Sequence, residues 1–124
     1  MSKKILVVDD SKTIRMSLTE ILGRLGNEVL LAETGDDALQ QVKGGLTADL
    51  VITDYNMPGM NGIELIEALR KEKAFRFLPI LVLTTETQGD LRQAAKKAGA
   101  TGWLVKPVNA QQLVQVVNQV MPGS

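Results

Sequence analysis

The 124-residue sequence contains neither cysteine nor histidine. Without cysteine, disulfides and thiolate metal sites are excluded, and we expect a cytoplasmic protein. Without histidine, the chain has no zinc site of His and Cys ligands, no Ser-His catalytic triad and no phosphohistidine of its own. Any catalytic or metal-binding site in this chain must therefore use side chains other than those of cysteine and histidine.

Aromatic residues are also scarce, at 3% of the chain, whereas 44% of residues are hydrophobic, so we expect an aliphatic core. The chain has room for one domain, which we place at residues 1–124. Fourteen basic and fourteen acidic residues cancel, which gives no general attraction to nucleic acid or to an anionic membrane. No apolar run approaches the roughly 20 residues that a bilayer crossing needs. We therefore expect neither membrane insertion nor a nucleic-acid partner.

Five short apolar runs predict five buried strands. The runs occupy residues 5–8, 29–32, 50–52, 80–83 and 103–105. Continuous apolar runs bounded by polar residues are typical of strands that a parallel sheet buries on both faces.

Apolar residues at helical spacing follow each of these runs, which predicts five helices. Ser11 or Asp10 is expected to cap the first helix, and Asn61 and Asn109 the third and the fifth. The predicted buried faces consist of Ile14, Leu18, Ile21, Leu22 and Leu25; Ala38, Leu39 and Val42; Ile63, Leu65, Ile66 and Leu69; Leu91, Ala94, Ala95 and Ala98; and Leu113, Val114, Val117 and Val120. Strands that alternate with helices require right-handed βαβ crossovers. We therefore expect an α/β fold, a doubly wound five-stranded parallel sheet in the flavodoxin-like order 2-1-3-4-5 with five helices.

Polar side chains stand at the ends of four predicted strands. They are Asp9 and Asp10 after the first strand, Asp54 after the third, Thr84 after the fourth and Lys106 after the fifth. In the expected order the first and third strands flank the switch point, where open α/β sheets bind ligands. We therefore expect these side chains to lie together at one edge of the sheet.

The acidic members of this set indicate a metal site. At an effective dielectric of about 20, each close pair of carboxylates costs on the order of 3 kcal/mol, and a hard cation such as Mg²⁺ relieves that repulsion. The alternative is that Asp9 and Asp10 only cap the first helix. Asp54 is the candidate nucleophile, because carboxylates form acyl phosphates. Lys106 and Thr84 would then neutralise the phosphoryl oxygens.

Four segments of the sequence resemble the motifs of response-regulator receiver domains, most of all those of the stand-alone chemotaxis type. They are residues 7–10, 53–62, 84–86 and 105–107, which read VVDD, TDYNMPGMNG, TTE and VKP. The resemblance covers essentially the whole chain. It implies a phosphorylation-activated response regulator of a two-component system that signals by protein–protein contact in chemotaxis or motility.

The resemblance also implies a role for each site residue. Asp54 would accept the phosphoryl group from a histidine kinase. Mg²⁺ would be held by Asp10, Asp54 and the backbone carbonyl of Asn56, with Asp9 acting directly or through water. Lys106 would pair with the phosphoryl group. Beyond its own phosphorylation and slow dephosphorylation, the chain is not expected to be an enzyme.

A switch is implied as well, in which the Thr84 hydroxyl moves toward the phosphoryl group and an aromatic residue of the fifth strand turns inward. Trp103 occupies that position, where Tyr or Phe is usual in the family. The fourth helix, the fifth strand and the fifth helix would dock a downstream protein. Residues 109–120 contain no charged residue, which suits an interface, although a merely solvated helix is the alternative. Val116 lies off the predicted buried face and is expected to be exposed.

Three further expectations come from the resemblance. Asn56 and Glu86, two residues after Asp54 and Thr84, would influence the lifetime of the phosphoryl group. The peptide bond before Pro107 is a candidate for the cis form, which is an option specific to proline.

Two other functions remain open from the residues alone. A phosphohydrolase with an aspartate nucleophile typically carries a second aspartate two residues later as general acid, and here that position is Asn56. A flavin-binding electron carrier shares the fold. However, Asp9 and Asp10 would repel a phosphate, and few aromatic residues are available to stack on a flavin.

Overall fold

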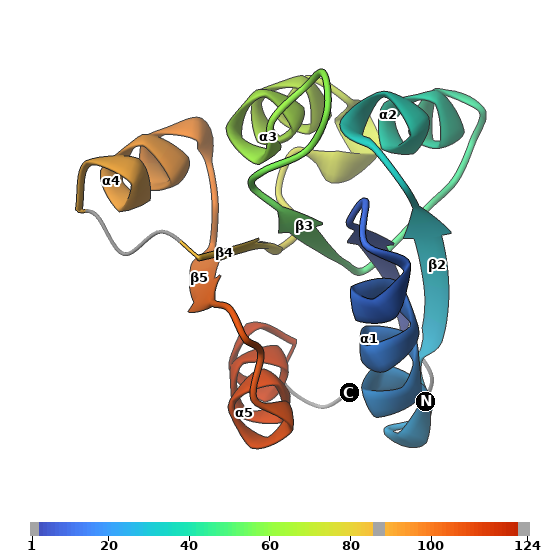
Figure 1. The fold of residues 1–124 in the computed structure, drawn as a ribbon. Helices are drawn as coiled ribbons and strands as arrows, with labels where there is room; N and C mark the ends of the chain where they lie inside the picture. The colour runs from blue at the N-terminus through green and yellow to red at the C-terminus, as the bar shows by residue number, and fades with distance from the viewer. Residues whose placement is uncertain (1–2, 86–88, 122–124) are drawn as a thin grey trace.

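The computed structural model describes residues 3–85 and 89–121, in which strands and helices alternate along the chain (Figure 1). The strands are β1 (Lys4–Val8), β2 (Glu28–Ala32), β3 (Leu50–Asp54), β4 (Ile80–Thr84) and β5 (Gly102–Val105). The helices are α1 (Lys12–Arg24), α2 (Gly35–Lys43), α3 (Gly62–Arg70), α4 (Gly89–Ala98) and α5 (Ala110–Val120), with a short 3₁₀ helix, η1 (Lys73–Phe75), before β4. The predicted alternation of five strands with five helices is confirmed.

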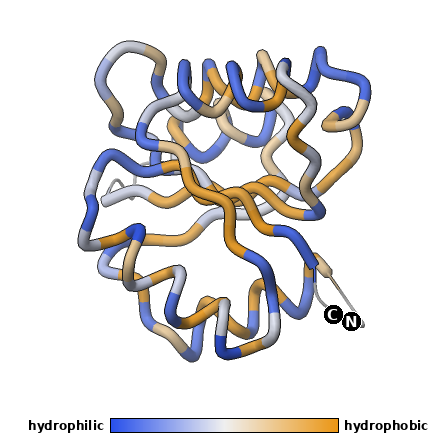
Figure 2. Tube along the Cα trace, turned by 90° about the vertical axis from the view of Figure 1, so that its right-hand side faces the viewer, coloured by the Kyte–Doolittle hydropathy of each residue, from blue (hydrophilic) through white to orange (hydrophobic). Residues whose placement is uncertain are grey.

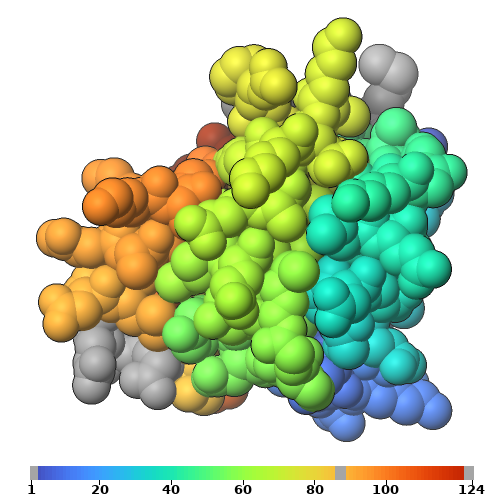
Figure 3. Space-filling view, turned by 90° about the horizontal axis from the view of Figure 1, so that it is seen from above, coloured from blue at the N-terminus to red at the C-terminus, as the bar shows by residue number. Residues whose placement is uncertain are grey.

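The five strands form one parallel sheet in the order β2-β1-β3-β4-β5. The predicted doubly wound, flavodoxin-like α/β fold is therefore confirmed. Helices α1 and α5 cover one face of the sheet, and α2, α3 and α4 cover the other (Figure 1). Seen from above in Figure 3, these last three helices lie side by side, with α3 in the middle. β5 is an edge strand, so α4, β5 and α5 are neighbours at one side of the molecule.

The core is aliphatic and is split into two layers by the sheet, whose strands are the most hydrophobic part of the chain (Figure 2). Alternate residues of a strand face opposite sides. In β1, Leu6 and Val8 contact the layer beneath α2 and α3, whereas Ile5 and Val7 contact the layer beneath α1 and α5. Burial of both faces explains why the three central strands, β1, β3 and β4, are continuous apolar runs, whereas Leu31 of the edge strand β2 is 42% exposed.

Side-chain caps fix where four of the helices begin. Ser11, rather than Asp10, caps α1 and accepts a hydrogen bond from the N–H of Ile14 at 3.3 Å. Asn61 caps α3 in a reciprocal capping box with Glu64, and Thr34 and Asn109 cap α2 and α5. None of the helices in the described part of the chain has the length and hydrophobicity that a bilayer crossing requires.

Three details of the predicted helix faces are wrong. Leu25 is 44% exposed, because the helix ends at Arg24 and Leu25 is its C-cap. Ala94 is exposed, since only one narrow row of α4 faces the core. On α5, Val116 is half-buried and contacts the core beneath α1 and α5, whereas Val114 is not part of that contact. Leu113, Val117 and Val120 face that core as predicted, so the buried face of α5 differs from the prediction only in Val116 taking the place of Val114.

Arg70, the last residue of α3, ties the segment before β4 to the end of α4. Its guanidinium donates to the backbone carbonyls of Phe75 (2.8 Å), Leu78 (2.6 Å) and Gly99. Burial of this group lowers the pKa of Arg70 from its usual value. These bonds fix the approach of the chain to β4 and β5, whose carboxyl ends form part of the site described next.

Candidate functional site

The carboxyl ends of β1 and β3 bring two acidic residues level with one another. The strands are neighbours, with Val8 opposite Thr53. The residue that follows Val8 is Asp9, directly after β1, and the residue that follows Thr53 is Asp54, the last residue of β3. Both side chains are buried, Asp9 completely and Asp54 to 3% exposure. The register of β1 and β3 therefore brings Asp9 and Asp54 together at the switch point, as predicted.

Asp10 completes a cluster of three carboxylates. An oxygen from each of Asp9, Asp10 and Asp54 lies within 4.8 Å of the others. Asp10 is exposed, so the cluster opens to solvent on its side. At an effective dielectric of about 20, two charges at this separation repel by about 3.5 kcal/mol. The fold therefore holds these groups together against a substantial electrostatic cost.

Lys106 partly offsets that cost. Its ammonium lies 3.1 Å from a carboxylate oxygen of Asp9 and 3.0 Å from one of Asp54. It is placed by the backbone, since the N–H of Lys106 donates to the carbonyl of Thr84 at 2.8 Å. One cation therefore contacts both buried carboxylates.

The balance of burial and charge shifts the pKa of both partners. Burial raises the pKa of Asp54, and the negative charge of Asp9 adds to this, while the hydrogen bonds from Lys106 and from the backbone N–H of Asn56 oppose it. For Lys106, burial acts to lower the pKa, but its hydrogen bonds to Asp54 and Asp9 outweigh burial and leave the pKa raised. Lys106 therefore stays positively charged at neutral pH.

Asp9 accepts three hydrogen bonds and does not cap α1. One of its oxygens accepts the N–H of Ser11 at 2.9 Å and the other accepts the Lys106 ammonium. Its backbone carbonyl accepts a hydrogen bond from Arg15 at 2.7 Å. Because Ser11 caps α1, the capping interpretation of Asp9 is wrong. The sequence analysis missed Arg15, and no motif marks it, since its contact depends on how α1 lies against the end of β1.

The remaining predicted residues lie at or near the same edge. Thr84 is the last residue of β4 and is fully buried. Asn56 is exposed in the loop that follows β3. The peptide bond between Lys106 and Pro107 is cis, as predicted. Glu86 lies outside the described residues.

The donor set of this edge fits a hard divalent cation. Three carboxylates supply only oxygen ligands, and one side of the cluster is open. Oxygen donors with room for waters are what Mg²⁺ prefers in proteins, and a cation there would relieve repulsion that a single lysine leaves in part unbalanced. The acidic pocket can therefore bind a metal ion.

Comparison with known proteins gives one consistent result. The profile of the response regulator receiver domain matches residues 5–118. The chain is 40% identical to chemotaxis protein CheY1 of Helicobacter pylori over 119 residues, which are 95% of this chain and 96% of that protein. It is 42% identical to the solved structure of chemotaxis protein CheY4 of Vibrio cholerae, with a TM-score of 0.92 over 97% of this chain and 99% of that one.

A more distant structure is informative about the site. The receiver domain of a sensor histidine kinase from Pseudomonas aeruginosa is 26% identical, with a TM-score of 0.88 over the whole of both chains. That structure is described as holding a magnesium ion in its active-site cleft.

Proposed function

Because this chain belongs to the response regulator receiver domain family and is similar to CheY-type chemotaxis proteins along almost its whole length, we propose that it is a phosphorylation-activated switch. In this proposal residues 1–124 act as a single receiver domain. A histidine kinase phosphorylates Asp54, and the phosphorylated protein signals by binding another protein, in chemotaxis or motility. The single observation that carries the proposal is the cluster of Asp9, Asp10 and Asp54, in which Asp9 and Asp54 are buried and both contact Lys106.

The phosphoryl transfer needs few groups from the protein. An oxygen of Asp54 attacks the phosphorus of the donor phosphohistidine, the P–N bond breaks, and the histidine leaves as imidazole. Such transfers depend mainly on positioning and on neutralising the phosphoryl oxygens. The Lys106 ammonium, which lies 3.0 Å from a carboxylate oxygen of Asp54, would hold one of these oxygens. The Thr84 hydroxyl at the end of β4 would hold another.

The metal ligands in this proposal are Asp10, Asp54 and the backbone carbonyl of Asn56, with Asp9 acting directly or through water. Bound there, Mg²⁺ would neutralise charge on the phosphoryl oxygens during transfer. The protein's own contribution is to hold the carboxylates in place. Asp9 does so through its bonds to Ser11 and Lys106. The exposed side chain of Asn56 would influence how readily water reaches the phosphoryl group.

For the output, we propose the face formed by α4, β5 and α5. Trp103 lies on β5, and apart from Ala110 the exposed side chains of α5 are uncharged glutamines and one asparagine, Asn118. Removing water from an uncharged face costs less free energy than removing it from a charged one when an interface forms. The exposed cations of α4, which include Arg92, Lys96 and Lys97, would favour an acidic partner surface.

The two alternative functions fit less well. A phosphohydrolase of the aspartate type needs a second carboxylic acid two residues after its nucleophile, and Asn56 cannot serve as that acid. For this reason we propose no enzymatic activity beyond self-phosphorylation and slow dephosphorylation. A flavin phosphate would meet the carboxylates of Asp9 and Asp10 at the switch point.

Intact-mass spectrometry with acetyl phosphate tests the proposal. Wild type is expected to gain one labile phosphoryl adduct with Mg²⁺ and none without it, and Asp54→Asn is expected to gain none. Asp36→Asn, an exposed aspartate on α2, is the matched control and should behave as wild type. An adduct that persists in Asp54→Asn would contradict the assignment of the nucleophile.

A further inference from the structure

The Trp103 side chain has an unsatisfied polar atom. Trp103 is half-buried on β5 and contacts the core layer beneath α3 and α4. Its indole Nε1 is shielded from solvent, and it is the one buried side-chain polar atom of the described residues without a hydrogen-bond partner. A buried donor without an acceptor destabilises the position it occupies. Some other interaction must therefore favour this position of the ring.

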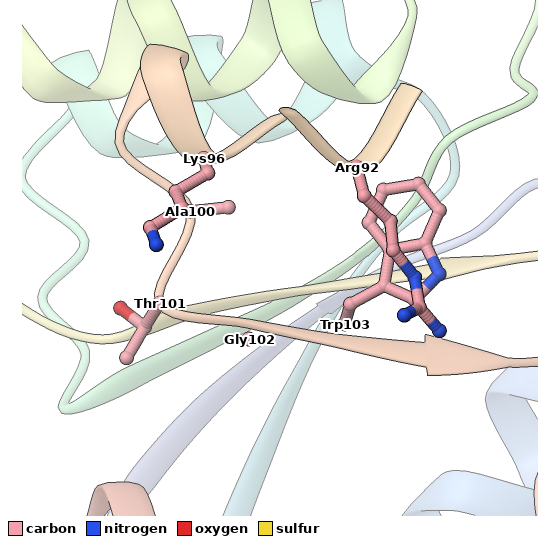
Figure 4. Close-up of a pocket in the computed structure, with 6 residues that line it drawn as sticks. All are labelled: Arg92, Lys96, Ala100, Thr101, Gly102 and Trp103. Carbon is pink, nitrogen blue, oxygen red and sulfur yellow. The ribbon is translucent and has the colours of Figure 1, made fainter. Parts of the chain in front are cut away.

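Arg92 supplies such an interaction. Its guanidinium carbon lies 5.8 Å from the centroid of the Trp103 ring, and Figure 4 shows the side chain reaching down from α4 over the indole. The guanidinium makes no ion pair with the described carboxylates, and Arg92 is exposed. A cation at this distance over an indole face is attracted by the π electrons. The strength of that attraction is of the same order as the cost of the unsatisfied N–H.

Packing alone does not fix the ring. Beside it lies a pocket of about 340 Å³, lined by Arg92, Lys96, Ala100, Thr101, Gly102 and Trp103 (Figure 4). Trp103 itself lines this pocket, so packing does not fill the space next to the ring. Lys96 lines the same pocket but is not the residue over the ring.

We infer that Arg92 is a positioning residue that holds the Trp103 indole in place by stacking on its face. Two effects of similar size then oppose each other: the attraction of Arg92 favours the present position of the ring, and the unsatisfied indole N–H disfavours it. Loss of the Arg92 guanidinium should therefore change the position of the ring. The consequence for signalling rests on the proposed function, since only there is Trp103 the residue that reports phosphorylation to the output face. The stacking itself does not depend on it.

The chain has a single tryptophan, so one indole N–H signal in a ¹⁵N-edited NMR spectrum reports on the ring. The measurement is the rate at which this N–H exchanges with water, together with quenching of Trp103 fluorescence by acrylamide. Loss of the stack in Arg92→Gln should raise the population of ring positions in which water reaches the N–H, and with it the exchange rate, roughly two- to fivefold. Arg92→Lys, which keeps a cation, should lie closer to wild type.

Lys96→Gln and Lys97→Gln are the matched controls, because each removes one positive charge from α4 without touching the ring. Both should exchange at the wild-type rate. The inference is overturned if Arg92→Gln exchanges like wild type, or if all three glutamine variants change equally. All of these positions are exposed, so melting temperatures close to wild type should accompany every variant.

Beryllofluoride binding with Mg²⁺, followed by ¹⁹F NMR, separates this inference from the proposed function. Wild type and Arg92→Gln should both bind it at Asp54. If neither protein binds beryllofluoride, the proposed phosphoryl chemistry is wrong. The exchange rates measured without beryllofluoride still decide the role of Arg92. If both proteins bind beryllofluoride and their indole N–H exchange rates are equal, the inference about Arg92 is wrong and the proposed function stands.

Discussion

Replacing Asp54 by asparagine should stabilise the protein in the absence of divalent cations. The Asp54 carboxylate is buried and lies within 4.8 Å of those of Asp9 and Asp10. At an effective dielectric of about 20, each repulsion amounts to about 3.5 kcal/mol, while the attraction to Lys106 at 3.0 Å amounts to about 5.5 kcal/mol. Burial of Asp54 and the repulsion from Asp9 together outweigh the attraction to Lys106, which is why the pKa of Asp54 is raised. Asp54→Asn should therefore gain about 1–2 kcal/mol.

Thermal unfolding in chelator, followed by circular dichroism, measures this gain. For a chain of this size we expect the melting temperature of Asp54→Asn to lie about 5 °C above that of wild type. Glu67→Gln, which removes one exposed carboxylate from α3, is the control and should melt with wild type. The gain should be specific to the buried charge.

The pH dependence gives the sign of the effect. Because the pKa of Asp54 is raised in the folded state, its contribution to stability is greatest below the unfolded value and is lost as the pH rises through the folded value. The advantage of Asp54→Asn should therefore grow as the pH rises through the folded pKa and vanish in acid, where both side chains are neutral. A variant that melts at or below wild type at pH 7, or an advantage that persists in acid, would refute the reasoning.

Three further substitutions test other parts of the structure by urea denaturation. Lys106→Met removes the cation that contacts both buried carboxylates and should cost about 3 kcal/mol; an unchanged midpoint would contradict its role. Gly62→Ala places a Cβ 2.6 Å from a main-chain oxygen of β3 and should cost about 1–3 kcal/mol, whereas Gly23→Ala, in open space on α1, should gain about 0.5–1 kcal/mol. Arg70→Met removes the donor to the carbonyls of Phe75, Leu78 and Gly99 and should cost about 2–3 kcal/mol, while Arg76→Met at an exposed position should cost little.

Much of this fold could be predicted because its local and global signals agree. Each strand is a continuous apolar run, and runs of that kind in alternation with helices leave few topologies. The acidic cluster could be predicted for the same reason, since Asp9 and Asp54 directly end strands that the fold makes neighbours. Such a prediction needs only the ends of the strands and their order.

Contacts made by long side chains between elements could not be predicted in this way. Arg15 reaches the carbonyl of Asp9, and Arg92 reaches Trp103, from helices whose placement depends on the packing of the whole core. The spacing of apolar residues likewise does not decide which residues at the border of a helix face are buried. On α5, Val114 and Val116 both fit an apolar stripe, and the contact with α1 and the sheet selects Val116.

The central claim is that the fold forces carboxylates together where a divalent cation can bind, and Mg²⁺ titration by calorimetry tests it most directly. Wild type and Asp36→Asn should bind one Mg²⁺ with a saturable heat, and a free concentration tenfold above the dissociation constant should add about 1.4 kcal/mol of stability. Asp10→Asn and Asp54→Asn should lose most of that affinity. Equal binding by all four proteins, or no binding by wild type, would contradict the account.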